Sequence, residues 1–319
     1  MLNKYTGGLL GCAVGDALGA PYEGLWSESI PEKQNFFCEY AIFEGYEKGQ
    51  YTDDTQLTIA TLQSIVAHKE ISVYLVAESM FSLWKTQVVI GPGGACTQSA
   101  DRFLSNNDPL NCGAVKGNAG NGTAMRTAML GLAFCDSPTK LPQEVAQISK
   151  LTHKDSRSIA GGIAIAKAAQ LIATEEVNIP YFCKEIAKTI YPYNEEFAKY
   201  IDVLPLYINR EDEETFAFIA WSGMERPEFA TPIITPFVIP TVLASLWSFL
   251  RYKDSWKDAV YGAIKMGGDV DTLGAITGAL SGIYLGESAI PSHLLKNVCS
   301  YDYLRDLACK YYYMSKVLL

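Results

Sequence analysis

The chain has 319 residues, of which 49% are hydrophobic and 19% are charged, and its formal net charge is −9. This composition excludes a disordered chain, and an acidic chain without a Lys/Arg run is not expected to bind nucleic acid. The eight cysteines include no Cys-x-x-Cys pair, so we expect free thiols in a cytoplasmic protein rather than a zinc motif or a disulfide scaffold.

Apolar residues recur at three-to-four spacing along most of the chain, whereas alternating strand patterns are scarce. We find no convincing domain boundary. The pattern therefore predicts an all-α fold, a compact single-domain multi-helix orthogonal bundle over residues 1–319. The predicted helices cover residues 9–17, 57–67, 73–84, 124–134, 145–151, 159–172, 240–250, 259–264, 273–284 and 304–314.

Small residues crowd two of these helices, one near each end of the chain. Glycine inside a helix costs about 0.5–1 kcal/mol relative to alanine, so a compensating contact is needed. Close approach of two helix backbones would provide that contact, and we expect these two helices to pack on each other. The small residues are Gly7, Gly8, Gly11, Ala13, Gly15, Ala17 and Gly19, and then Gly274, Ala275, Gly278, Ala279 and Gly282.

The first glycine-rich helix also carries Asp16, and Glu23 follows it. Burying an unpaired acid is costly, so Asp16 is either an exposed or capping carboxylate or part of a site. Glu23 alone carries no signal.

Thr52-Asp53-Asp54-Thr55 precedes the helix that we expect to begin near Gln56. Thr and Asp commonly cap helices, because their oxygens accept hydrogen bonds from free backbone N–H groups. Capping explains one acid easily and two adjacent acids less well.

A glycine- and asparagine-rich loop, residues 117–123, precedes the helix that starts at Ala124. Such a loop presents backbone N–H groups and the positive end of a helix to an anion such as phosphate. The alternative is an ordinary turn with a helix cap, and the spacing matches neither a P-loop nor a Rossmann motif.

His153 separates two helical patterns, and a lone histidine is usually a surface or capping residue. His68 and His293 have no informative context. With three histidines in the chain, a histidine-rich zinc site is excluded, which favours Mg²⁺ or Mn²⁺ over zinc.

Residues 210–236 are charged at first and then rich in aromatic residues and proline, and we expect a loop or the edge of a lid. The following run, residues 233–250, is uncharged and nearly long enough to span a membrane. Pro236, Pro240 and several hydroxyl residues interrupt it, so we expect a buried helix and no membrane partner.

The second acidic cluster is Gly267-Gly268-Asp269-Val270-Asp271-Thr272, which also precedes a helix. In an extended segment, residues two apart point the same way, so we expect Asp269 and Asp271 to share a direction. Two acidic pairs tolerate each other only around cations, and divalent ions prefer carboxylate and hydroxyl oxygens. The two clusters together predict a split site that holds two metal ions.

In this order, the segments resemble the ADP-ribosylglycohydrolase family. The matching segments are residues 8–19, Thr52-Asp53-Asp54-Thr55, residues 120–126, Leu151-Thr152-His153, residues 267–272 and residues 286–291.

The resemblance implies an all-α domain with two Mg²⁺ (or Mn²⁺) ions, and hydrolysis at the anomeric carbon of the distal ribose of ADP-ribose. A carboxylate would take a proton from the attacking water. By motif match, the metal ligands would be Thr52, Asp53, Asp54, Asp269, Asp271 and Thr272. The candidate catalytic acids would be Glu23, Asp53 and Asp54, and ADP-ribose would be bound by Gly120, Asn121, Gly122 and His153.

The segment 235–240 departs from the Gly-Tyr-Val run of many relatives. It is closer to relatives that remove ADP-ribose from serine or act on O-acetyl-ADP-ribose, so arginine or serine linkage stays open. The substrate would be an ADP-ribosylated protein. The alternatives are a small ADP-ribosyl conjugate such as O-acetyl-ADP-ribose, or a non-catalytic, ADP-ribose-binding or crystallin-like relative, although an intact acidic set argues against the last.

Overall fold

The computed structural model describes residues 1–42, 45–226 and 230–317, and these residues form helices joined by loops, with three isolated β-bridges and no sheet. The prediction of an all-α fold is confirmed. The α-helices are α1 (Leu2–Gly19), α2 (Lys33–Phe36), α3 (Asp53–His68), α4 (Val73–Lys85), α5 (Gly94–Asn106), α6 (Ala124–Leu132), α7 (Leu141–Ser149), α8 (Ser156–Thr174), α9 (Ile179–Ile190), α10 (Glu195–Val203), α11 (Glu213–Trp221), α12 (Val238–Arg251), α13 (Trp256–Ile264), α14 (Val270–Leu285), α15 (Ser292–Asn297) and α16 (Tyr301–Ser315).

Each of the ten predicted helices is present, with different ends, and further helices were not predicted. The prediction of a loop over residues 210–236 is wrong in part, because α11 lies within it. The Asp212 side chain accepts a hydrogen bond from the Thr215 N–H at 2.8 Å, so the charged start of this segment is a helix N-terminus.

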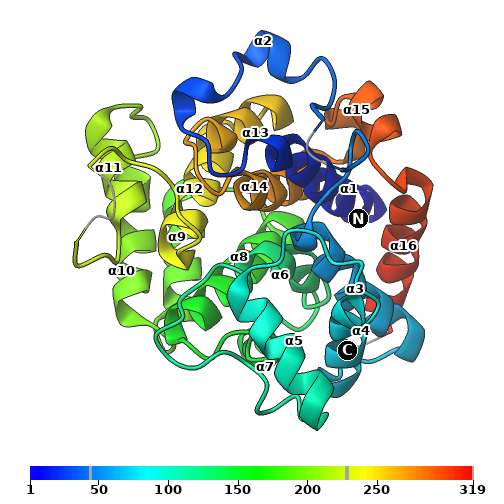
Figure 1. Cartoon of the computed structure of the whole chain (residues 1–319). Helices are drawn as coiled ribbons and strands as arrows, with labels where there is room; N and C mark the ends of the chain where they lie inside the picture. Colours follow the sequence, from blue (N-terminus) through cyan, green and yellow to red (C-terminus); the bar gives the residue numbers. More distant parts are fainter. Residues whose placement is uncertain (43–44, 227–229, 318–319) are drawn as a thin grey trace.

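The predicted pairing of the two glycine-rich helices is correct: α1 and α14 lie side by side in the middle of the molecule (Figure 1). Gly11 faces the backbone of Gly278, and a Cβ atom on Gly11 would clash with the Gly278 carbonyl. The missing side chains let the two backbones touch, which offsets the low helix propensity of glycine.

The apolar run after residue 233 forms α12, whose residues Val238 to Leu250 are all buried, as predicted. Its side chains, with those of α6, α8 and α14, belong to one hydrophobic cluster that includes Trp247 and Trp256. Within the described residues, no helix combines the length and apolar character needed to cross a membrane.

Candidate active site

The two acidic clusters meet in one pocket of about 180 Å³, as predicted. Asp53 and Asp54 come from the first turn of α3, and Asp269 and Asp271 from the start of α14. Glu23, which follows the short 3-10 turn after α1, lines the same pocket. Carboxyl oxygens of Glu23, Asp269 and Asp271 lie within 4.8 Å of one another, close enough to hold one cation.

The local geometry differs from the expected geometry in both clusters. The helix α3 begins at Asp53 and not near Gln56, and Asp271 lies in the first helical turn of α14 rather than in an extended segment. The two carboxylates do share a direction, as expected, because both line the pocket with oxygens within 4.8 Å of each other. The extended backbone expected to cause this is wrong, since Asp271 is helical.

Gly268 connects the three chain segments that surround Asp269. Its φ of +87° is strained for residues other than glycine, and a Cβ atom here would clash with the Ile234 carbonyl oxygen. The Gly268 N–H donates to the Leu25 carbonyl at 2.8 Å, and the Asp269 N–H donates to the Ile234 carbonyl at 2.8 Å. These bonds hold Asp269 between the Glu23 segment and the segment that enters α12.

Asp16 caps α3 from a neighbouring helix, which the sequence did not reveal. Its carboxylate accepts the N–H groups of Thr52 at 3.0 Å and of Thr55 at 3.0 Å. It also accepts both hydroxyls, at 2.9 Å and 2.6 Å. The capping alternative considered for Asp16 is thus correct, but the capped helix is α3 and not its own.

The Thr52 side chain, predicted as a metal ligand, is not among the residues that line the pocket. Its hydroxyl also lies 3.2 Å from Asp54 Oδ2, so it connects the acid that caps α3 to an acid that faces the pocket. Thr272, in contrast, lines the pocket beside Asp271.

Burial and mutual repulsion disfavour the charged form of every pocket acid. Burial, and next the charge of Asp271, raise the pKa values of Asp53 and Asp54 well above the ordinary carboxyl range. Burial, and next Asp269, do the same for the pKa of Asp271, and burial raises the pKa of Asp269. Desolvation, and next Asp271, raise the pKa of Glu23 to about 7. The full set of carboxylates is therefore stable at neutral pH only with added positive charge.

The described residues that line the pocket include no lysine or arginine to supply that charge. His153 lines it, but burial and the charge of Arg126 lower the pKa of His153 to about 3, so its imidazole is neutral. Asp54 Oδ1 is buried and has no hydrogen-bond partner within the described residues. An all-oxygen donor set with an unused carboxylate oxygen fits a hard divalent cation.

The loop before α6 borders the acids, and part of its expected anion-binding capacity is already used. The Asn121 N–H donates to the Pro236 carbonyl at 3.0 Å, and the Gly117 N–H donates to Asp155 Oδ2 at 2.8 Å. The Asn121 side-chain amide donates to Asp269 and, at 3.0 Å, to Thr241. Asn121 therefore holds Asp269 in place, which is a role that its motif did not indicate.

His153 packs against the same loop, so that a Cβ atom on Gly120 would lie 2.8 Å from His153 Nε2. Its Nδ1 lies 2.9 Å from the Thr152 hydroxyl, which accepts a hydrogen bond from Arg126 at 2.9 Å. The Thr152 hydroxyl lies closer to His153 Nδ1 than to its other acceptor, the Ser149 carbonyl at 3.5 Å, and donation along the shorter contact leaves the imidazole proton on Nε2. His153 thus presents a donor toward Gly120, on the pocket wall.

Arg126, also unassigned from the sequence, lies fully buried behind this loop. Its guanidinium donates to the carbonyls of Gly122 and Ile148. Burial lowers the pKa of Arg126, and its Nε has no partner among the described residues. Arg126 lies within a family-matching segment, but only its burial identifies it as a support for the loop.

Two further loops contribute to the pocket wall. Gly91, Gly93 and Gly94 come from the loop before α5, and Pro236 is the residue that the described part of segment 210–236 contributes.

Comparisons with known proteins agree on one family across almost the whole chain. The family model for ADP-ribosylglycohydrolase matches residues 1–317. ADP-ribosyl-[dinitrogen reductase] glycohydrolase of Rhodospirillum rubrum is 25% identical, with 93% of this chain and 90% of the relative covered. ADP-ribosylhydrolase ARH3 of Gallus gallus is 26% identical, with 90% and 87% covered.

A third relative and a solved structure extend the comparison. ADP-ribosylarginine hydrolase Tri1 of Serratia proteamaculans is 23% identical, with 98% of this chain and 80% of the relative covered. A solved structure described as an ADP-ribosylglycohydrolase-related protein complex is 25% identical, with a TM-score of 0.72 and 98% of each chain covered.

Proposed function

Since this chain belongs to the ADP-ribosylglycohydrolase family, we propose that it is a metal-dependent hydrolase that releases ADP-ribose from modified protein side chains. The bond cleaved is the one at the anomeric carbon of the distal ribose. The observation that carries this proposal is the convergence of five acids, from opposite ends of the chain, in a pocket whose described lining has no basic side chain. A family member that had lost catalysis would not need to keep such an unfavourable charge cluster.

The residues of the pocket fit two Mg²⁺ or Mn²⁺ ions. We propose Asp53, Asp54, Asp269, Asp271 and Thr272, which line the pocket, as ligands. Thr52 completes the ligand set of the motif match, and its hydroxyl would have to turn away from Asp16 to reach a metal ion. Glu23, assigned from the sequence only as a catalytic acid, is also close enough to Asp269 and Asp271 to share a cation with them. Bound ions would polarise ribose hydroxyls and lower the pKa of a bound water.

The chain's own residues would then orient the substrate and move a proton. Glu23 combines a position on the pocket with a pKa near 7, which suits a general base that takes a proton from water. Asp53 and Asp54 remain the alternatives, because both also line the pocket.

Binding of the remainder of ADP-ribose is assigned to the loop before α6. Gly120, Asn121 and Gly122 would lie along the pyrophosphate, because they line the acidic pocket together with His153. The neutral His153 would donate its Nε2 proton to the ligand. Asn121 would keep Asp269 in place while its loop contacts the pyrophosphate.

The acceptor linkage stays open between arginine and serine. The names of the Rhodospirillum and Serratia relatives designate a protein-linked substrate and an ADP-ribosylarginine substrate, respectively. The Thr235-Pro236-Phe237 segment instead favours serine as the acceptor residue. O-acetyl-ADP-ribose is the small-molecule alternative. The eight free cysteines favour a reducing cytoplasm as the site of action.

A release assay for free ADP-ribose tests the proposal. Arginine-, serine- and acetyl-linked substrates are compared with Mg²⁺, with Mn²⁺ and with EDTA. We expect release from at least one substrate with metal and none with EDTA. Release that is unchanged by EDTA would refute metal dependence, and no release from any substrate would favour a non-catalytic ADP-ribose-binding protein.

A further inference from the structure

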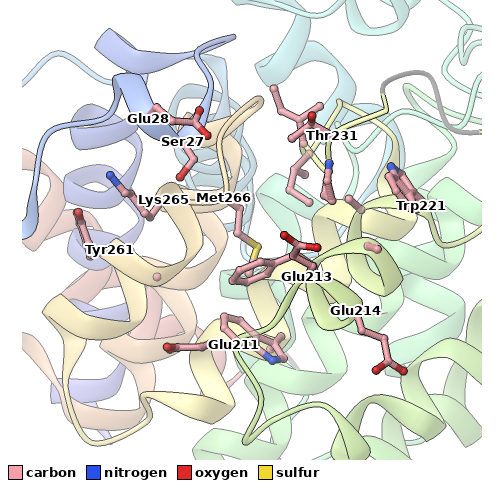
Figure 2. Close-up of a pocket in the computed structure, with 18 of the residues that line it drawn as sticks. Ser27, Glu28, Glu211, Glu213, Glu214, Trp221, Thr231, Tyr261, Lys265 and Met266 are labelled. Carbon is pink, nitrogen blue, oxygen red and sulfur yellow. The ribbon is translucent and has the colours of Figure 1, made fainter.

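A second cavity, of about 850 Å³, is larger than the acidic pocket and shares no described lining residue with it (Figure 2). It lies between α11, the C-terminal part of α12, α13 and residues 230–234. Phe216, Trp221 and Trp247 contribute aromatic surface to its wall. A cavity of this size and lining can enclose a large side chain together with part of its backbone.

The cavity adjoins the acidic pocket, because three chain segments line both. Ile234 lines the cavity and Pro236 lines the acidic pocket, and two residues span at most about 7 Å. Glu23 lines the acidic pocket and Ser27 lines the cavity, and this separation of four residues spans at most about 14 Å. In the third segment, Met266 lines the cavity and Asp269 lines the acidic pocket. The two sites are therefore separated by the length of a few residues of extended peptide.

Acidic residues predominate among the charged residues around the cavity, but two of them are already paired. Glu211 accepts a hydrogen bond from Arg251 at 2.7 Å, and Glu214 pairs with Arg210. Lys265, the one lysine of the described lining, donates to the Ile30 carbonyl at 3.0 Å.

The carboxylates of Glu28 and Glu213 have neither a hydrogen bond nor an ion pair with any described residue. Figure 2 shows the Glu213 carboxylate in the middle of the cavity lining, whereas Glu214, next to it in sequence, points away. An unpaired carboxylate beside aromatic surface attracts a cation that carries apolar groups. It repels a diphosphate, so this cavity does not suit the nucleotide part of the substrate.

We propose that this cavity binds an arginine or lysine side chain of the polypeptide that carries the ADP-ribose, an inference that rests on the proposed function. The aliphatic stem would lie on Phe216 and Trp221, and the charged head would pair with Glu213. Since the two linings are at most about 14 Å apart along these segments, the basic residue stands within about four positions of the modified residue. The enzyme would thus select modified sites in basic sequence contexts.

A binding experiment tests this without requiring turnover. Two unmodified peptides are compared, identical except for Arg or Gln three positions from the acceptor residue, and binding is followed by titration calorimetry. We expect wild type to prefer the Arg peptide, and Glu213→Gln to weaken its binding about fivefold with little change for the Gln peptide. Glu214→Gln is the matched control, since it removes the same charge from the adjacent position and should leave the preference intact.

Equal binding of the two peptides by wild type would overturn the proposal, as would equal losses in Glu213→Gln and Glu214→Gln. The failure of the proposed function would give a different result. In that case the Arg peptide would still bind and depend on Glu213, but no ADP-ribose would be released from its modified form.

If the proposed function holds, KM for release from the modified Arg peptide should rise in Glu213→Gln. KM for a small ADP-ribosyl substrate without a peptide should stay unchanged. A parallel rise for both substrates would mean that Glu213 acts on the ADP-ribose site, and would overturn the assignment of the cavity to the polypeptide.

Discussion

The buried carboxylate of Asp16 holds the start of α3, and with it Asp53 and Asp54, in place. Replacing Asp16 by Ala removes a helix cap and takes away the carboxylate acceptor of the Thr52 and Thr55 N–H groups and of the Thr55 hydroxyl, whereas the Thr52 hydroxyl keeps Asp54 as an acceptor. We expect Asp16→Ala to lower the free energy of unfolding by about 2–4 kcal/mol in excess metal, as measured by urea denaturation.

The control for this variant is Thr61→Ala, in the same helix. Thr61 bonds only to the Leu57 carbonyl of its own helix, at 2.8 Å, and it does not line the pocket. Asp16→Ala should weaken metal binding more than Thr61→Ala does. Unchanged metal affinity in Asp16→Ala would contradict the positioning role.

Asp269 tests the pocket itself, because it meets both Asn121 and the acids around it. We expect Asp269→Ala to abolish ADP-ribose release and to weaken metal binding at least tenfold, while the helical circular dichroism spectrum stays the same. The exposed Asp101→Ala in α5 is the control and should keep full activity. Full turnover by Asp269→Ala at ordinary metal concentration would refute the assignment of the site.

At the scale of elements, the contact between α1 and α14 decides where the acids lie, because Asp16 belongs to α1 and Asp271 to α14. A methyl group on Gly11 would push against the Gly278 backbone, which cannot yield as a side chain can. We expect Gly11→Ala to lower the free energy of unfolding by about 2–3 kcal/mol, although alanine is the better helix former.

Gly94→Ala in α5 is the comparison for that prediction, because no heavy atom lies within 4 Å of an added Cβ there. Without a clash, this change should leave the free energy of unfolding unchanged or raise it by up to about 1 kcal/mol. Similar losses for Gly11→Ala and Gly94→Ala would show that backbone contact between α1 and α14 is not the cause.

At the scale of the whole molecule, the acid cluster makes stability depend on pH and metal. The pKa of Asp16 is about 7 in the folded chain against 3.8 ordinarily, because of burial first and Asp271 next, and the pocket acids shift in the same direction. Between pH 4 and 7 the folded chain then binds more protons than the unfolded chain, so stability falls as pH rises.

In EDTA, we therefore expect a lower melting temperature at pH 7.5 than at pH 5, measured by scanning calorimetry. His153 acts in the opposite sense below about pH 6.5, but it is one group against several acids. Adding Mg²⁺ or Mn²⁺ at pH 7.5 should raise the melting temperature. A higher melting temperature at pH 7.5 than at pH 5 in EDTA would contradict this account.

The same calorimetry bears on domain organisation. We propose that residues 1–319 form one domain, because the helices at the two ends of the chain share one hydrophobic cluster. One transition with equal calorimetric and van't Hoff enthalpies is expected, and two separate transitions would refute a single domain.

The sequence by itself determined the helical class, the pairing of the glycine-rich helices and the identity of the acids that meet. Apolar periodicity and small-residue spacing are local patterns that can be read from the sequence alone. Two distant acid pairs are a recognisable signal for a shared site, because hard divalent cations prefer carboxylate oxygens. Helix ends and the loop 210–236 were less well predicted, because a helix end depends on which groups satisfy its free N–H donors.

Only the tertiary structure decided the roles of Asp16, Asn121 and Arg126. Asp16 caps a helix that begins 37 residues later, at Asp53, Asn121 holds an acid 148 residues away, and Arg126 is recognisable as a support only through its burial. The second cavity likewise exists only where α11 meets α12 and α13. Such contacts join residues that are remote in the chain. Local sequence patterns do not predict them, because the free energy of each contact depends on its burial and geometry in the folded structure.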